Sequence, residues 1–435
     1  MPTPQTTLAI LSGIAIGAAG LVQGLHWKSA ASPPEDLTQL QTQLRIAAEE
    51  NEMLKRENES LRSLAQGGGD LSVPPELIAR VEKDLGLHFR STPAIQRTTA
   101  EALRDRISAE IESRFGPEGL QDRQESYSLI GLLRPGDDLL AQLTASTATG
   151  SSAWFDPEMG EGWMLDRADL KNIPDQAALL GLLARILLHQ NFPPPEDYPG
   201  DDACRALEAL HQGTASGVQA RFMAEMARTL GFMPMVQNSA KEQLLASLSP
   251  FLQGLTNFPN LEGKSHADAL HLKGDAALHA AFRQPPLTTC AIVLTAESAS
   301  PPAALSLPTP PEEPFLTESA GLLGLRLWLE PLGDVGTASE IALNWKNDRY
   351  LLFPDGESSA AILWEIELSS AAATDQLEAI ALDLAAALAG QQDAGTRGKI
   401  IHSAHDRFLA ITRPAPTRLR FLNTSLAATA EKLSR

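Results

Sequence analysis

Cysteine is scarce in this sequence, which has only Cys204 and Cys290 among its 435 residues. Two cysteines are too few for a disulfide framework or for a zinc site built from cysteine alone. They could pair with each other in an oxidising compartment, although buried free thiols are the ordinary case. The sequence therefore excludes a disulfide-rich scaffold and leaves the state of these two thiols open.

Positive charge is scarce as well, with 35 Lys and Arg residues against 54 Asp and Glu residues, which gives a formal net charge of −19. Nucleic-acid binding needs a basic stripe or patch, and none is visible. There is no glycine-rich phosphate loop, and GTASG at 213–217 lacks the Gly-x-Ser-x-Gly spacing of a nucleophile elbow. Its two glycines instead predict a helix that packs closely against another. Nucleic acid is therefore excluded as a partner, and an acidic solvated surface is expected.

An uncharged run of eighteen residues lies near the N-terminus, LAILSGIAIGAAGLVQGL at 8–25. As a helix it spans about 27 Å, which just crosses the hydrocarbon core of a bilayer. The triplet at 29–31, Ser-Ala-Ala, resembles a signal-peptide cleavage site, so a cleaved and exported form is the alternative. The length of the run and the lack of a basic segment before it favour an uncleaved anchor. Small residues four apart, at Gly13 and Gly17 and again at Gly20 and Gly24, suit close approach of two membrane helices.

A heptad repeat follows the membrane segment. Its a positions are Leu37, Leu44, Asn51 and Asn58, and its d positions are Leu40, Ala47, Leu54 and Leu61. Asparagine at a favours two strands in register, and the charged residues at g and e of neighbouring heptads form attractive pairs between parallel helices. The sequence therefore predicts a parallel homodimer held by the membrane helix and the coiled coil together.

The remaining chain is long enough and apolar enough, at 43% hydrophobic residues, to build a large core. Apolar periodicity and breaks at Gly and Pro predict helices at 75–86, 98–115, 136–147, 175–190, 201–231, 239–254, 265–283 and 371–389. Alternating or short apolar runs predict strands at 324–330, 348–353, 360–369 and between 399 and 412. The proline-rich stretch at 300–314 should be an extended surface loop. These patterns predict an α+β fold, mainly helical, with a C-terminal antiparallel sheet and a covering helix.

Six blocks of this chain resemble a bacterial family of zincin-type neutral zinc metallopeptidases, which are often exported or membrane-anchored. The blocks are LGLHFR at 85–90, SSAWFDPEMGEGWML at 151–165, AALLGLLARILLHQNF at 177–192, LHQNFP at 188–193, RALEALHQGTASGVQARFMAE at 205–225 and LNWKNDRYLLF at 343–353. The resemblance implies a zincin-like domain whose central helix is the apolar helix at 175–190.

In that family the central helix carries His-Glu-x-x-His, which supplies two zinc ligands and the base that activates a zinc-bound water. Alignment on the Gln-Asn-Phe that ends the helix puts Gly181 and Leu182 where the first His and the Glu belong, and Arg185 where the second His belongs. The third ligand, a glutamate on the next long helix, corresponds to Gln212.

All four positions have lost their chemistry. Glycine has no ligating atom, leucine is no base, arginine is always cationic, and the amide of Gln212 is a weak zinc ligand. The resemblance therefore implies an inactive pseudo-peptidase without metal or cofactor. We expect Arg185 to take the place of the ion and to pair with Glu208, one helical turn before Gln212.

The alternative is an active zinc-dependent hydrolase with displaced ligands. His189 and His211 lie near the altered positions and could be joined by Asp201 or Asp202. Five further histidines are expected at the surface, namely His266, His271, His279, His402 and His405.

The predicted organisation has six parts. They are a signal anchor at 1–28, a parallel coiled coil at 35–66, a glycine-rich linker at 67–73, a degenerate zincin-like domain at 74–299, the proline-rich loop at 300–314 and an α+β lobe at 315–435. Binding or scaffolding is the expected role, with a peptide or protein partner in the old substrate cleft. Lys28 after the span favours a cytoplasmic C-terminus, whereas the family resemblance favours export, and an extracytoplasmic body is expected.

Overall fold

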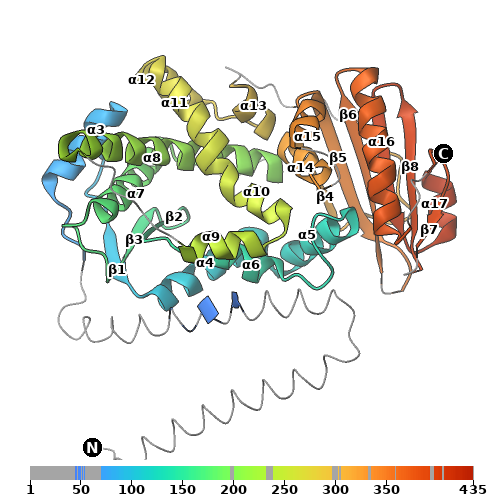
Figure 1. Ribbon diagram of the computed structural model, residues 1–435, viewed down its shortest axis with the longest axis horizontal. Coiled ribbons are helices and arrows are strands. Elements are labelled where there is room, and N and C mark those ends of the chain that lie inside the picture. Colours follow the sequence, from blue (N-terminus) through green and yellow to red (C-terminus); the bar gives the residue numbers. More distant parts are fainter. Residues whose placement is uncertain are drawn as a thin grey trace, which may run out of the picture. The chain divides into compact units, whose positions relative to one another are not determined.

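Helices dominate the described residues between 70 and 295, and an antiparallel sheet dominates those after 305 (Figure 1). The computed structural model describes residues 70–195, 200–231, 239–295, 305–331, 335–357, 359–391, 396–403 and 406–434, with residue 302 and isolated positions between 45 and 53. The predicted anchor at 8–25 lies outside these residues, as does nearly all of the predicted coiled coil. Within the described ranges, no helix is both long enough and apolar enough to cross a bilayer.

The helical part contains twelve described elements in chain order. They are α3 (Pro75–Leu85), α4 (Ala100–Phe115), α5 (Pro117–Ile130), α6 (Leu139–Ala148), α7 (Ile173–Asn191), α8 (Asp201–Leu230), α9 (Ser239–Ser247), α10 (Pro250–Phe258), the π-helix η1 (Pro259–Gly263), α11 (Lys264–Leu272), α12 (Asp275–Arg283) and α13 (Thr289–Leu294). A small sheet is inserted, in which β3 (Glu161–Leu165) pairs with β1 (Ile95–Thr98) in parallel and with β2 (Ala153–Asp156) antiparallel.

Local sequence explains where these helices start and stop. The Thr99 side chain accepts the backbone N–H of Ala102 and so caps α4. Pro250 begins α10, with Ser249 as its cap, and therefore breaks the single helix predicted at 239–254. Gly274, at φ +102°, divides the helix predicted at 265–283 into α11 and α12. Helix α5 follows α4 directly at Gly116 and was not predicted.

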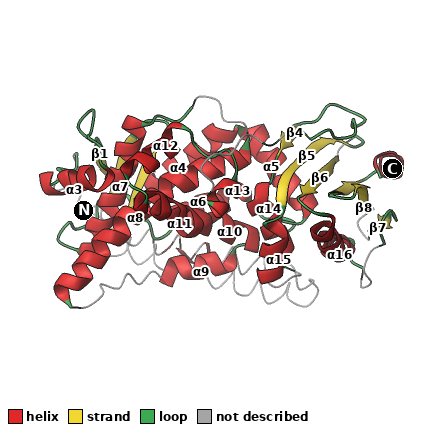
Figure 2. Cartoon of the chain, turned by 90° about the horizontal axis from the view of Figure 1, so that it is seen from above, coloured by secondary structure: helices red, strands yellow, loops and turns green. Residues whose placement is uncertain are grey.

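The C-terminal sheet has the strand order β4-β5-β6-β9-β8-β7, and each pair of neighbouring strands in this order is antiparallel. The strands are β4 (Leu316–Glu318), β5 (Trp345–Pro354), β6 (Ala360–Leu368), β7 (Ile401–His402), β8 (Phe408–Ala415) and β9 (Arg418–Thr424). Figure 2 shows α16 (Ala371–Leu388) alongside this sheet. The predicted antiparallel sheet with a covering helix is confirmed.

Both faces of the sheet are buried. On one face Trp364 and Phe421 pack against Trp328 of α14 (Gly321–Leu329), with ring centroids 4.9 and 5.8 Å apart. On the other face Leu363 and Leu422 form a cluster with residues of α17 (Ala427–Leu433). A helix on each side explains why the strands read as nearly continuous apolar runs rather than as clean alternation.

The strand predicted at 324–330 is wrong, because this segment belongs to α14. Its sequence GLLGLRLWL is apolar almost all round, and a short run of that kind does not distinguish a buried strand from a buried helix. Asp348 stabilises the start of this helix by accepting the backbone N–H groups of Ala320 (2.8 Å) and Gly321 (2.9 Å). The same buried carboxylate accepts the indole N–H groups of Trp345 and Trp364. Helix α15 (Val335–Ala342), strand β9 and helix α17 were not predicted.

The described part of the proline-rich stretch, residues 305–314, has neither helix nor strand, as predicted. Leu305 is buried, and Leu307 packs against the cluster on the α17 face of the sheet. This segment therefore lies along the body of the protein.

Asp201, the first residue of α8, ties the helical part to the sheet. Its carboxylate accepts N–H groups of Arg123 at 2.8–3.1 Å and the hydroxyl of Tyr127 at 3.2 Å. Glu318 of β4 accepts another Arg123 N–H group at 3.0 Å and the backbone N–H of Asp201 at 2.9 Å. The Glu318 carboxylate thus lies at the N-terminus of α8, the positive end of the helix dipole. The Arg123 guanidinium lies between the carboxylates of Asp201 and Glu318.

Asp202 points in another direction and holds α13. It accepts the hydroxyl of Thr289 at 2.7 Å and its backbone N–H at 3.2 Å. A side chain at Gly321 would collide with this carboxylate, so the start of α14 needs glycine. Burial, with the nearby charge of Asp348 adding to it, raises the pKa of Asp202 to about 7 against the lowering effect of Thr289.

The raised pKa predicts a pH dependence of stability. Folded Asp202 keeps its proton between its unfolded pKa, near 4, and about 7, so its contribution to stability falls as pH rises through that window. Between pH 4 and 8 we expect the free energy of unfolding of the wild type to fall by about 2–4 kcal/mol more than that of the Asp202→Asn variant. Urea unfolding of both chains across this range measures the difference. Parallel curves for the two chains would contradict the burial of an ionisable Asp202.

Helix α8 and η1 approach each other backbone to backbone. A Cβ atom at Gly213 would overlap the backbone of Gly263, whereas at Gly217 it would meet only the flexible ends of Asp268 (2.9 Å) and Arg221 (3.1 Å). The close packing expected from the glycines of GTASG is therefore confirmed at Gly213.

This difference gives a matched pair of substitutions. We expect Gly213→Ala to destabilise the protein by about 3 kcal/mol, since two backbones must move apart. Gly217→Ala gains helix propensity of about 1 kcal/mol, which offsets its small clash. Thermal or urea unfolding compares the two, and equal losses would rule out the tight α8–η1 contact as their cause.

Candidate functional site

Helices α7 and α8 carry the four altered positions and lie next to each other (Figure 1), and Arg185 of α7 contacts α8. Its Nη1 donates to Glu208 Oε1 at 2.8 Å and to Gln212 Oε1 at 2.9 Å, and its Nη2 donates to Glu208 Oε2 at 3.0 Å. Arg185 therefore makes a bidentate ion pair with Glu208. The predicted pairing of Arg185 with Glu208 is confirmed.

The environment of this pair is only partly dry. The side chain of Arg185 is 15% exposed and that of Glu208 is 41% exposed. Burial opposes ionisation of Glu208, but the charge and hydrogen bonds of Arg185 outweigh it and lower the pKa of the carboxyl. The guanidinium also lies 5.2 Å from the ring centroid of Phe155 in β2. Its Nε is buried and has no hydrogen-bond partner among the described residues.

Gly181 and Leu182 present no chemistry beside Arg185. A side chain at Gly181 would overlap Gln219 of α8, so the glycine lets the two helices pack with that amide between them. Leu182 is 4% exposed and lies under Gly162 of β3. The face of α7 that the resemblance assigns to ligands is thus filled by packing.

Polar side chains continue from Arg185 along α8 to η1. Gln212 donates to Asn260 at 3.2 Å, and Ser216 donates to the same amide oxygen at 2.8 Å. Sequence reasoning missed Ser216 and Asn260. The position of Ser216, one turn after Gln212, was the available signal, whereas Asn260 is brought in by the tertiary contact of η1.

His189 lies in the last turn of α7, as expected. Its ring meets Phe155 edge-on at a centroid distance of 5.4 Å, and it lies against the turn at Gly160. Burial lowers its pKa, and the charge of Arg185 adds to the effect, although a hydrogen bond to Pro157 opposes it. The imidazole is therefore neutral at pH 7.

His211 is buried and packs edge-on against Phe282 at 4.9 Å. Burial, followed by the charge of Arg185, lowers its pKa to about 3. Asp201 and Asp202 lie at the start of α8, about 15 Å before His211 at 1.5 Å per residue. Their carboxylates bind Arg123 and Thr289 instead. The expectation that either aspartate could join His189 and His211 is wrong. No three His, Cys, Asp or Glu side chains within the described ranges are placed to hold a metal ion.

The remaining histidines and cysteines differ in burial. His266 is 3% exposed, so its predicted surface position is wrong, and its Nδ1 lacks a partner within the described part of the chain. His279 contacts the carbonyl oxygen of Leu85 at 2.8 Å, and His405 lies outside the described residues. Both cysteines are free thiols, and burial raises the pKa of Cys290 to about 11, which keeps it protonated.

Comparisons of this chain with protein-family models, with curated proteins and with solved structures find no match. Arg185, Glu208, Gln212, Ser216 and Asn260 provide hydrogen-bond donors and acceptors in fixed positions, and they offer neither a nucleophile with a base nor a ligand set.

The ion pair at this site can be measured by a double-mutant cycle. Arg185→Met leaves Glu208 without its partner and should cost about 1–2 kcal/mol, discounted for the exposure of the carboxylate. Glu208→Gln in the Arg185→Met background should cost much less than in the wild type, with a coupling of about 1 kcal/mol. Urea unfolding at pH 7 gives the four values. Additive losses would mean that the two side chains do not interact in solution.

Proposed function

We propose that this protein is a catalytically inactive relative of zincin-type zinc metallopeptidases that binds a peptide or protein partner without cutting it. One observation carries the proposal, namely that Arg185 occupies the interface of α7 and α8 with its charge neutralised by Glu208. Arginine stays protonated and cannot bind a metal, its guanidinium already engages Glu208, and the neighbouring Gly181 and Leu182 supply neither ligand nor base. These positions therefore supply no group that could bind a catalytic metal or activate a water for peptide hydrolysis.

Partner binding is supported by two features beside the ion pair. Strand β2 is an edge strand of its described sheet, and Phe155 of this strand lies over Arg185. An extended peptide can add to such an edge by main-chain hydrogen bonds. The half-exposed Glu208 and the amide of Asn260 then offer polar contacts to its side chains. In this proposal the polar row from Arg185 to Asn260 selects the partner.

The proposal includes a single-pass membrane anchor at 8–25 and a parallel dimer through the coiled coil at 35–66. The two protomers of such a dimer would present two binding surfaces at the membrane and would bind a partner with two matching sites more tightly than one protomer could. The body is proposed to lie outside the cytoplasm.

Restoring the lost residues tests the kinship with zincins. We expect the full-length variant Gly181→His, Leu182→Glu, Arg185→His, Gln212→Glu, with Gln219→Ala to make room at position 181, to bind about one zinc ion per chain. Elemental analysis and a zinc-dependent rise in melting temperature measure the gain.

The matched control keeps Gln212 and changes only the other four positions, which removes the third ligand. It should bind zinc at least about tenfold more weakly. A folded five-position variant that binds no zinc would overturn the zincin interpretation. Circular dichroism establishes that each variant is folded.

A further inference from the structure

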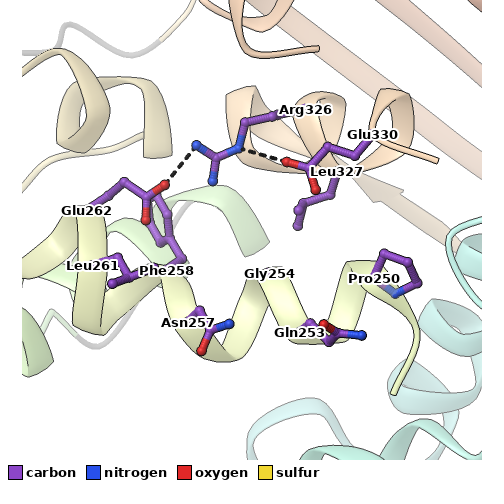
Figure 3. Close-up of a pocket in the computed structure, with 10 residues that line it drawn as sticks. All are labelled: Pro250, Gln253, Gly254, Asn257, Phe258, Leu261, Glu262, Arg326, Leu327 and Glu330. Atoms are coloured by element: carbon purple, nitrogen blue, oxygen red, sulfur yellow. Dashed lines mark ion pairs between the residues drawn. The ribbon is translucent and has the colours of Figure 1, made fainter. Parts of the chain in front are cut away.

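A cavity of about 230 Å³ opens between α10, η1 and α14, apart from the Arg185 site (Figure 3). This volume is smaller than the usual site for a drug-sized ligand, which takes about 300–1,000 Å³. Its size suits one side chain of a partner.

The charged groups of the cavity do not balance. Arg326 lies between Glu262 and Glu330, as Figure 3 shows, with Nη1 2.8 Å from a Glu262 oxygen and Nε 3.7 Å from a Glu330 oxygen. Only the first contact is within hydrogen-bond distance. One guanidinium therefore faces two carboxylates that are 26% and 22% exposed, so the charged side chains that line the cavity sum to −1 in a partly desolvated place. Burial raises the pKa of Glu330 despite Arg326, and the charge of Glu262 adds to the rise.

Apolar surface lies next to these carboxylates. Gly263 at the end of η1 packs on the backbone of Ala209 in α8, which fixes the π-turn. Leu261 in the same turn is 64% exposed. Leu327 forms the opposite wall and packs against Gly254 of α10. Single-turn π-helices often mark functional positions, and this one places an apolar wall beside an acidic end.

We propose that the cavity receives a lysine side chain from a partner protein. The methylene stem lies between Leu261 and Leu327, and the ammonium group reaches the free carboxylate oxygens of Glu262 and Glu330. A compact ammonium fits this end better than a second guanidinium, because Arg326 already occupies the planar contact with Glu262. The net charge of −19 favours approach of a basic partner. This site does not depend on the function proposed for the Arg185 region.

Small probes test the proposal on the full-length chain. We expect Nα-acetyl-lysine N-methylamide to bind with a Kd of about 1 mM by ligand-observed NMR, and the uncharged norleucine analogue to bind at least about tenfold more weakly. Glu330→Gln should weaken lysine binding about fivefold or more, since an ion pair is lost in a partly dry site. Glu313→Gln, on an exposed loop, removes the same charge without touching the cavity and should change the Kd less than about twofold.

Three outcomes would overturn the proposal. Equal binding of the norleucine analogue would make the cavity merely apolar. Equal effects of the two glutamate substitutions would make the attraction a property of the overall charge. Binding of n-butylamine as tight as that of the lysine amide and of lysine-containing tetrapeptides would assign the cavity to a free amine instead of a protein side chain. Thermal unfolding of each variant verifies that it is folded.

Discussion

The buried start of α8 is the constraint on which the rest of the structure depends. Asp201 and Asp202 are neighbours in sequence, so their side chains leave the helix in different directions. One binds Arg123 and, through it, Glu318 of the sheet, and the other binds Thr289 of α13. These contacts fix both the position and the rotation of α8. Glu208 and Gln212 consequently face α7, and Gly213 faces η1.

An ion pair of the protein's own residues links α7 and α8 at the centre of the helical part. A metal ion in such a place would be bound or lost with changing conditions, whereas arginine keeps its charge at every accessible pH. Its partner Glu208 has a lowered pKa, so the contribution of the pair is present above the ordinary pKa of glutamate and is lost only in acid. The ion pair therefore links α7 and α8 throughout the neutral and alkaline range.

Sequence patterns were most informative where the apolar period was long. Helices α7 and α8 were predicted from apolar spacing and helix breakers, whereas the pairing of Arg185 with Glu208 was predicted from the zincin resemblance, which placed these two helices face to face. The patterns failed at α14, where a short, fully apolar run gave no period, and at His266, where burial came from tertiary packing. Sequence patterns could not predict the roles of Asn260 or of the acidic cavity. Both depend on π-helix η1, whose position follows from the contact of Gly263 with α8 and not from local propensity.

The most direct test of an inactive, metal-free centre is the zinc content of the full-length chain after mild purification, together with a thermal-shift titration with zinc. We predict far less than one zinc ion per chain and no change in melting temperature, because Arg185 occupies the centre and no described residue completes a ligand set with His189 and His211. Near-stoichiometric zinc with a raised melting temperature, lost on changing His189 or His211 to alanine, would contradict this and identify the protein as a metal-dependent hydrolase candidate with displaced ligands.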